Sequence, residues 1–151
     1  MSRFDYNLIA IGAGSGGLVS TFIASAVKAK VALIEKHKMG GDCLNTGCVP
    51  SKALISSALI SSAKAVQMLK KHTLYGLKNV SYEVDFALTM ERVQDIIAKV
   101  EPHDSVARYS SLGVECHIGE AMIRSPHEVE VNGQVLTKKT IVVATGARPF
   151  V

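Results

Sequence analysis

The sequence predicts an α/β fold built on a parallel β-sheet, with a small antiparallel β-meander in its second half. An apolar run at residues 6–11 ends at a glycine-rich turn, and helical spacing and a second apolar run at 31–34 follow. This strand–helix–strand order within about 30 residues indicates a parallel βαβ unit. From residue 114 the apolar period falls to two, and Asn132-Gly133 is a strong hairpin signal.

The remaining elements are predicted from turn residues and spacing. Residues 36–50 should be irregular, and Pro50 should lie in the first turn of a helix over 51–71. A helix from Phe86 or Ala87 to Lys99 and a short one over 102–112 should follow. The meander is expected over 114–138 and a closing strand over 140–146, with strands at 114–118, 121–123, 128–131, 134–136 and 140–144.

Length and composition suit one domain and exclude several classes of protein. Of the 151 residues, 48% are hydrophobic and 20% charged, unlike a disordered chain. Three cysteines are too few for a disulfide-stapled mini-protein. The net charge of +4 is not gathered in a Lys/Arg block, and the longest apolar-leaning stretch, 53–69, contains four serines. We therefore expect no nucleic-acid partner, no membrane segment and a cytoplasmic location.

Residues 12–17 fit the G-x-G-x-x-G pattern of dinucleotide-binding turns. Gly12 permits the tight turn, Gly14 lets the backbone approach a pyrophosphate, and Gly17 lets helix and strand pack closely. The phosphates would lie at the N-terminus of the helix that follows. Glu35, at the end of the second strand, would accept hydrogen bonds from a ribose. An acid there favours FAD or NAD over NADP, and the motif does not choose between FAD and NAD.

Cys43 and Cys48 form a second candidate site. On one regular helix the two side chains would point apart, so a bridge requires a break, which Gly47 could provide. Such a closed loop would stay reducible. Spacing alone leaves three readings open: a redox pair, inert buried thiols, or a zinc site completed by His37 or by Cys116 and His117.

Residues 40–52, GGDCLNTGCVPSK, closely resemble the active-site signature of the class I pyridine nucleotide–disulfide oxidoreductases. This family includes dihydrolipoamide dehydrogenase, glutathione reductase and mercuric reductase. The segment IAIGAGSGG resembles the family's FAD fingerprint, and VVATGARP resembles the segment that closes its first FAD-binding stretch. The resemblance covers the whole chain, and EPHDS and GVECHIGEA are most similar to the mercuric reductase branch.

The resemblance implies a Rossmann-like FAD-binding domain and a role for each matching residue. Cys48 would be the charge-transfer thiol beside the flavin, Cys43 the interchange thiol that attacks the substrate, and Lys52 a cation near flavin N5. Asp42 replaces a usual threonine beside the flavin, which is a departure from the family pattern. No metal ligand is expected, and the other cofactor-binding residues would be Gly12, Gly14, Gly17, Glu35, Gly41, Ala121, Ala144, Thr145 and Gly146.

The implied function is that of an NAD(P)H-dependent flavin disulfide oxidoreductase. Electrons would pass between NAD(P)H, FAD and the Cys43–Cys48 disulfide, and on to a small-molecule disulfide or a metal ion. The family's NAD(P) and dimerisation domains have no counterpart in these 151 residues. We therefore expect a truncated, N-terminal part of the FAD-binding domain of a homodimer, inactive alone. The alternatives are a non-enzymatic zinc- or thiol-sensing nucleotide-binding module, and a flavin or NAD enzyme that does not use the cysteines.

Overall fold

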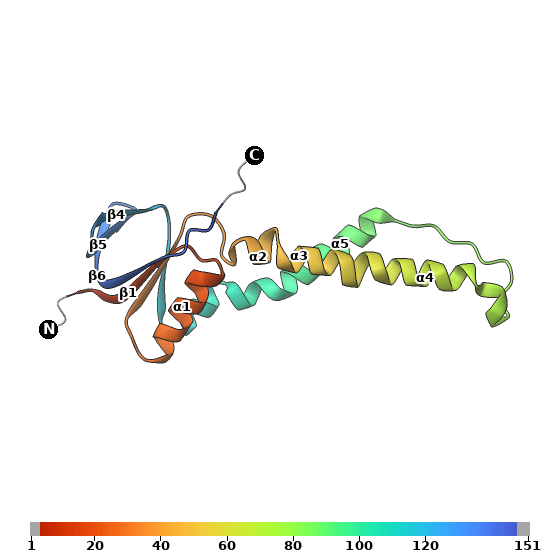
Figure 1. The fold of residues 1–151 in the computed structure, drawn as a ribbon, viewed down its shortest axis with the longest axis horizontal. Coiled ribbons are helices and arrows are strands. Elements are labelled where there is room, and N and C mark those ends of the chain that lie inside the picture. Colours follow the sequence, from red (N-terminus) through yellow and green to blue (C-terminus); the bar gives the residue numbers. More distant parts are fainter. Residues whose placement is uncertain (1–3, 148–151) are drawn as a thin grey trace.

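The structure is a computed structural model that describes residues 4–147. One six-stranded mixed sheet lies at one end, and a long helical arm projects from it (Figure 1). The order of strands across the sheet is β3-β2-β1-β6-β5-β4. Their bounds are β1 Tyr6–Ile11, β2 Val31–Glu35, β3 Val114–Ile118, β4 Ala121–Ser125, β5 Glu128–Val131 and β6 Gln134–Val143.

The predicted βαβ unit is β1, α1 (Ser15–Ala26) and β2, and the two strands pair in parallel. Residues 31–34 of β2 are all buried because both faces of the sheet are covered here. On one face Leu33 packs with Leu18 of α1 and with Tyr109 of α6 (Val106–Ser111). On the other face Ile34 packs with side chains of β5 and β6. The site described below therefore rests on a rigid, two-sided core.

Two sequence predictions about the second half of the sheet were wrong. β3 was expected in the meander, but it pairs in parallel with β2 at the edge of the main sheet. The two strands expected at 134–136 and 140–144 are the single strand β6. Residues 134–137 of β6 pair antiparallel with β5, and residues from Lys138 onward pair parallel with β1. The meander is therefore β4–β5–β6. The prediction failed because a period of two indicates a strand but does not indicate which strand pairs with it.

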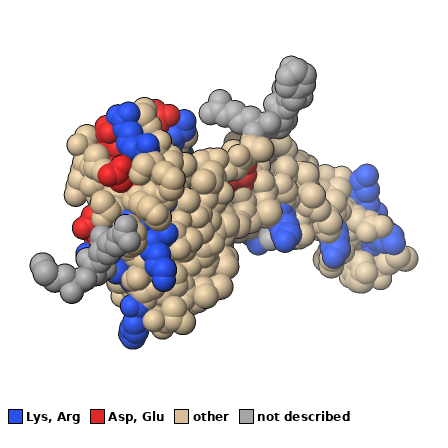
Figure 2. Space-filling view, turned by 60° about the vertical axis from the view of Figure 1, so that its left-hand side comes forward, with Lys and Arg blue, Asp and Glu red and all other residues tan. Residues whose placement is uncertain are grey.

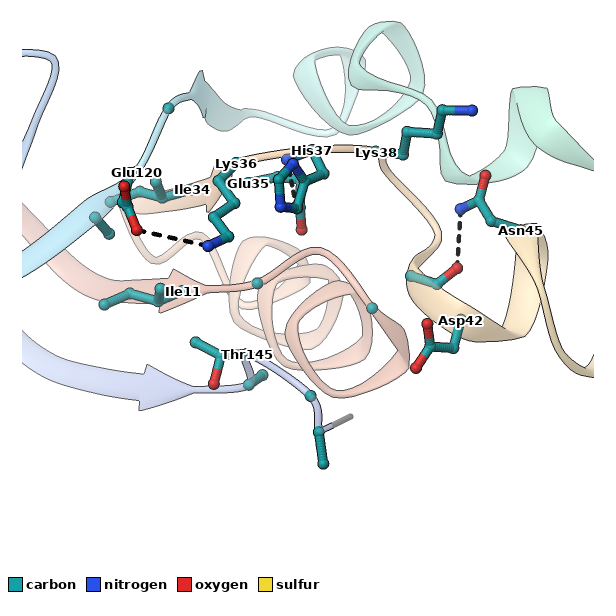
Figure 3. A pocket seen from close by; sticks show the side chains of 18 residues that line it. Ile11, Ile34, Glu35, Lys36, His37, Lys38, Asp42, Asn45, Glu120 and Thr145 are labelled. Carbon is teal, nitrogen blue, oxygen red and sulfur yellow. Dashed lines mark hydrogen bonds and ion pairs between the residues drawn. The ribbon is translucent and has the colours of Figure 1, made fainter. Parts of the chain in front are cut away.

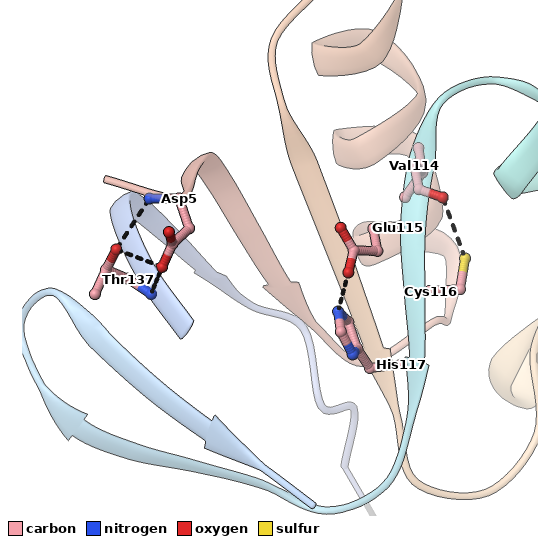
Figure 4. A network of polar contacts seen from close by, with 6 residues as sticks. All are labelled: Asp5, Val114, Glu115, Cys116, His117 and Thr137. Atoms are coloured by element: carbon pink, nitrogen blue, oxygen red, sulfur yellow. Dashed lines mark hydrogen bonds and ion pairs between the residues drawn. The ribbon is translucent and has the colours of Figure 1, made fainter. Parts of the chain in front are cut away.

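A reciprocal contact fastens the start of β1 to β6. The Asp5 carboxylate accepts hydrogen bonds from the Thr137 hydroxyl at 2.7 Å and the Thr137 N–H at 3.0 Å (Figure 4). The Asp5 N–H in turn donates to the Thr137 hydroxyl at 2.9 Å. These hydrogen bonds lower the pKa of Asp5 below its ordinary value. The contact lies where β6 changes partner from β5 to β1, so it helps to fix that change of register.

The arm consists of a long helix that runs away from the sheet and a second helix that runs back to it. The first begins at Cys48, three residues before the predicted start at 51, and continues through α3 (Cys48–Lys52), a π-helical segment η1 (Ala53–Leu59) and α4 (Ile60–Lys70). After a 3₁₀ turn, η2 (His72–Tyr75), and a loop, α5 (Phe86–Val100) returns to the sheet. The single helix predicted over 102–112 is instead η3 (Glu101–Asp104) and α6, because Ser105 is extended and caps α6.

The π-helical segment coincides with a repeated pentapeptide. The residues Ala-Leu-Ile-Ser-Ser at 53–57 recur at 58–62. Ala53 and Ala58 are both buried against Val93 of α5. In a regular α-helix, five residues turn by about 500°, which would place the two alanines on different faces. The wider π turn, with its i→i+5 period, brings both toward α5, so the helix register suits the repeat.

Candidate functional site

A cleft of about 640 Å³ lies at the carboxyl ends of β1, β2 and the last part of β6 (Figure 3). Ligand sites in open parallel sheets form at this edge. Four stretches that are far apart in the sequence, within residues 11–14, 34–45, 119–121 and 144–147, contribute to its walls. Of the residues predicted to bind the cofactor, the cleft is lined by Gly12, Gly14, Glu35, Gly41, Asp42, Ala121, Ala144, Thr145 and Gly146.

The first glycine of the turn is required by both its conformation and its surroundings. Gly12 has φ +101°, and a Cβ built on it would lie 2.2 Å from the carbonyl oxygen of Ala144. The Ala144 N–H also donates to the carbonyl of Ile11 at 2.8 Å. The end of β6 is thus held directly against the glycine-rich turn, which brings residues 144–146 into the cleft.

Gly17 does not line the cleft, and its role is packing. A Cβ at Gly17 would lie 1.8 Å from the carbonyl oxygen of Gly12. The helix α1 therefore begins in close contact with the end of β1. No side chain caps α1 at Gly14, so its first-turn N–H groups remain available to an anion.

Gly41 connects the glycine-rich turn to the segment that carries the cysteines. It has φ +54°, and a Cβ there would lie 2.6 Å from the Cα of Gly14. The Gly40 N–H donates to the carbonyl of Ala13 at 2.8 Å. The helix α2 (Gly41–Asn45) starts from this contact. Cys43 is therefore placed by a segment whose backbone packs directly against the glycine-rich turn.

Glu35 makes two hydrogen bonds with the backbone. Its Oε2 accepts from the N–H of Ala13 at 2.7 Å, and its Oε1 accepts from the N–H of His37 at 2.8 Å. Each carboxylate oxygen has two lone pairs, so both keep the capacity to accept a further hydrogen bond from a ribose hydroxyl. The carboxylate thus lies in the cleft in a fixed orientation.

The cysteine segment is more regular than predicted. Residues 36–50 were expected to be irregular, but Cys43 lies in α2 and Cys48 is the first residue of α3. The break between them is at Thr46 and Gly47, as the geometry of a bridge requires. The Gly47 N–H donates to the carbonyl of Asp42 at 2.6 Å, and a Cβ on Gly47 would lie 2.9 Å from that oxygen.

The break brings the two thiols within hydrogen-bonding reach of each other. The hydrogen bond with Cys48 raises the pKa of the Cys43 thiol, and the positive charge of Lys52 opposes that increase. Both cysteines are free thiols in this structure, Cys43 half-buried and Cys48 exposed. Neither cysteine lines the cleft, nor does Lys52, which follows Cys48 by one helical turn. Gly41 and Asp42, immediately before Cys43, do line it.

Sequence reasoning missed several residues of the cleft. Lys36 and Glu120 face each other across it, with Nζ and Oε1 3.5 Å apart (Figure 3). Asn45 donates to the carbonyls of Met39 and Gly41, at 3.0 and 2.8 Å, and so holds the start of α2. The available signal was a basic run, Lys36-His37-Lys38, directly after the strand-end acid. Gly119 was also missed, and its N–H donates to the carbonyl of Glu35.

The zinc alternative finds no ligand cluster. Cys116 and His117 are neighbours on β3, so their side chains point to opposite faces of the sheet (Figure 4). His117 Nε2 lies 3.3 Å from a carboxylate oxygen of Glu115, and burial raises the pKa of the Cys116 thiol. Within residues 4–147, no group of three or more His, Cys, Asp or Glu side chains is arranged to hold a metal ion.

A parallel sheet with a glycine-rich turn, a strand-end acid and paired thiols near the same cleft defines a dinucleotide-binding redox domain. The family model described as pyridine nucleotide-disulphide oxidoreductase matches residues 6–151. The chain belongs to this family, whose members use FAD and NAD(P)H. The predicted family and Rossmann-like fold class are confirmed.

Curated relatives include three kinds of oxidoreductase. A dihydrolipoyl dehydrogenase of Mycoplasma pneumoniae is 37% identical over 146 residues, which cover 96% of this chain and 31% of the relative. A mercuric reductase of Bacillus cereus is 35% identical over 145 residues, 96% of this chain and 22% of the relative. A glutathione reductase of Burkholderia cepacia is 33% identical over 153 residues, which cover 99% of this chain and 32% of the relative. The chain thus spans between about a fifth and a third of the length of these relatives.

The helices were also compared with the requirements for crossing a membrane. None of those formed by residues 4–147 is both long enough and apolar enough to do so.

Proposed function

We propose that this chain binds FAD in the cleft and carries the redox-active cysteine pair of an NAD(P)H-dependent flavin disulfide oxidoreductase. The observation that carries the proposal is the position of the thiols. Cys43 and Cys48 approach each other across a helix break, in a segment that Gly41 packs directly against the phosphate-facing turn. A cytosolic pair that can close and reopen is more often catalytic than structural.

The cleft fits FAD on several counts. The first-turn N–H groups of α1 suit a diphosphate, and the oriented carboxylate of Glu35 suits a ribose with free hydroxyls. At Ala121, Ala144 and Gly146 a cofactor would meet little side-chain bulk. When bound, FAD would supply two-electron transfer between a nicotinamide and the cysteine pair. Asp42 adds a negative charge to the wall where the family usually has threonine.

The cysteines would carry the electrons onward. A Cys43–Cys48 disulfide takes up two electrons and two protons and becomes two thiols. The attacking sulfur must be a thiolate. The hydrogen bond with Cys48 raises the pKa of the Cys43 thiol, and the cation of Lys52 opposes that increase. We propose Cys43 as the interchange thiol and Cys48 as the thiol beside the flavin. The acceptor would be a small-molecule disulfide or a metal ion, in keeping with the names of the relatives.

We further propose that the parent protein is a homodimer and that this chain alone binds FAD weakly and is inactive. From residue 138, the side of β6 away from β1 has no strand partner among residues 4–147, and Val143 is 60% exposed. The arm exposes Leu74, Tyr75, Phe86 and Leu88. The charged side chains visible on its outer part are lysines or arginines (Figure 2). We propose that another segment of the parent protein covers the open edge of β6 and that a second subunit packs against the arm.

The test is a spectroscopic comparison of cysteine variants of the full-length parent protein. We expect bound flavin that dithionite bleaches, and a long-wavelength charge-transfer band after reduction by NAD(P)H. Cys48→Ser should abolish that band, whereas Cys43→Ser should keep it and abolish disulfide reductase activity. Cys116→Ser is the matched control, because Cys116 lies apart on β3, and it should change neither.

Two results would contradict this function. A purified parent protein that never holds flavin would remove the cofactor from the proposal. Full activity and an intact charge-transfer band in both Cys43→Ser and Cys48→Ser would instead indicate a flavin or NAD enzyme that does not use the cysteines.

A further inference from the structure

Glu35 touches the glycine-rich turn as well as facing the cleft. Its Oε2 accepts the Ala13 N–H at 2.7 Å, across 22 residues of sequence. Ala13 is fully buried, so its N–H would otherwise lack a partner. The Ala13 carbonyl accepts from Gly40 at 2.8 Å. The middle of the turn is therefore held on one side by Glu35 and on the other by the segment that leads to Cys43.

We propose that Glu35 is a positioning residue for the diphosphate site, in addition to any contact with a ribose, an inference that rests on the proposed dinucleotide function. Ala13 lies between two glycines, Gly12 and Gly14, which leave the unliganded turn many conformations. The charge-assisted hydrogen bond from Ala13 selects the conformation in which α1 begins at Ser15, directly after Gly14, which lines the cleft. The anion site is thus formed before the ligand arrives.

The two backbone donors require a carboxylate and not merely a polar side chain. The N–H groups of Ala13 and His37 point at the two different oxygens of Glu35. A glutamine has one oxygen and one NH₂ group, so one of these N–H groups would face a donor and remain unsatisfied. Glu35→Gln should therefore loosen the turn even though the side chain keeps its size.

Electrostatics predicts the opposite sign for the same substitution, which makes the inference testable. Glu35, Asp42 and Glu120 are negative groups in the lining of the cleft, and Lys36 and Lys38 are positive ones, with His37 between them. Removal of one negative charge should by itself favour a bound anion. Glu120 provides the matched control, because its carboxylate forms an exposed ion pair with Lys36 and makes no contact with the glycine-rich turn among the hydrogen bonds and ion pairs of residues 4–147. Glu120→Gln removes a charge from the cleft without touching the turn.

The experiment titrates the 151-residue chain with inorganic pyrophosphate and, separately, with adenosine, followed by the NMR shifts of its backbone amides. Pyrophosphate has no ribose, and adenosine has no phosphate. We expect Glu35→Gln to weaken pyrophosphate binding roughly tenfold, the scale of one hydrogen bond to a charged group. Glu120→Gln should leave it unchanged or strengthen it. Hydrogen exchange at the Ala13 amide should be faster in Glu35→Gln alone.

A second variant separates charge from geometry. Glu35→Asp keeps the charge but is one methylene shorter, so it cannot reach both donors, and it should weaken pyrophosphate binding as Glu35→Gln does. Circular dichroism and thermal melts would show that each variant is folded. If one variant does not fold, the other carries the comparison.

Three outcomes would overturn the inference. Pyrophosphate binding in Glu35→Gln that equals or exceeds that of the wild type, with adenosine binding alone reduced, would make Glu35 a ribose ligand only and leave the proposed function intact. Unchanged Ala13 exchange would also refute the positioning role. A wild-type chain that binds no pyrophosphate would refute a preformed anion site, and the flavin spectrum of the parent protein would still test the proposed function independently.

Discussion

Replacement of Gly17 by alanine tests the closest contact between α1 and β1. The new Cβ would lie 1.8 Å from the Gly12 carbonyl oxygen and 3.0 Å from its carbon, where ordinary contacts begin at 3.4 Å. Both atoms belong to the backbone, so no side chain can rotate away. The helix and the turn would have to separate by about 1.6 Å. Overpacking of this kind costs about 3 kcal/mol, at the upper end of the usual range.

Part of this cost is offset, since alanine is favoured over glycine inside a helix by about 1 kcal/mol. We expect Gly17→Ala to lower the free energy of unfolding by about 2 kcal/mol and the Tm by roughly 4–8 °C. Gly16→Ala is the matched control one residue away, because its Cβ would meet only the Ala144 Cβ at 3.4 Å. It should be neutral or stabilising by up to about 1 kcal/mol.

The assay is urea unfolding of the 151-residue chain, followed by far-ultraviolet circular dichroism for the wild type and both variants. Equal m-values would show that the same surface is exposed on unfolding, so that the midpoints compare stability directly. Equal midpoints for Gly17→Ala and Gly16→Ala would refute the reasoning, because the carbonyl contact would then carry no energetic consequence.

Three further predictions concern other contacts. Because hydrogen bonds from Thr137 lower the pKa of Asp5, the stability from this carboxylate is present above its ordinary value of 3.8 and is lost as the pH falls through the lower folded-state value. Asp5→Asn should flatten that part of a plot of Tm against pH, and an unchanged plot would contradict the contact. Ala58→Leu should destabilise the arm by about 1–3 kcal/mol in urea, because Ala58 is 1% exposed against α5, whereas Ala63→Leu on the exposed face of α4 should be nearly neutral. Lys36→Met should change the free energy of unfolding by less than about 1 kcal/mol, because the Lys36–Glu120 pair is solvent-exposed. A larger loss of stability in urea unfolding would contradict this expectation.

The sequence alone indicated the elements whose signals are local. The apolar runs of β1 and β2, the glycine-rich turn between them and the Asn132-Gly133 hairpin lie where those residues predict. The cysteine signature likewise identified the family without any coordinates. Such signals are readable because hydrophobic spacing and turn chemistry act over a few residues and do not depend on distant partners.

The tertiary structure alone decided what depends on pairing between distant segments. The alternation in β3 predicted a strand but not its place beside β2, and nothing local marks the point where β6 leaves β5 for β1. The bond between Glu35 and Ala13 likewise depends on how the end of β2 meets the turn after β1. Strand partners and long-range hydrogen bonds are set by packing of the whole sheet, whereas a periodic pattern specifies only which face of an element is buried.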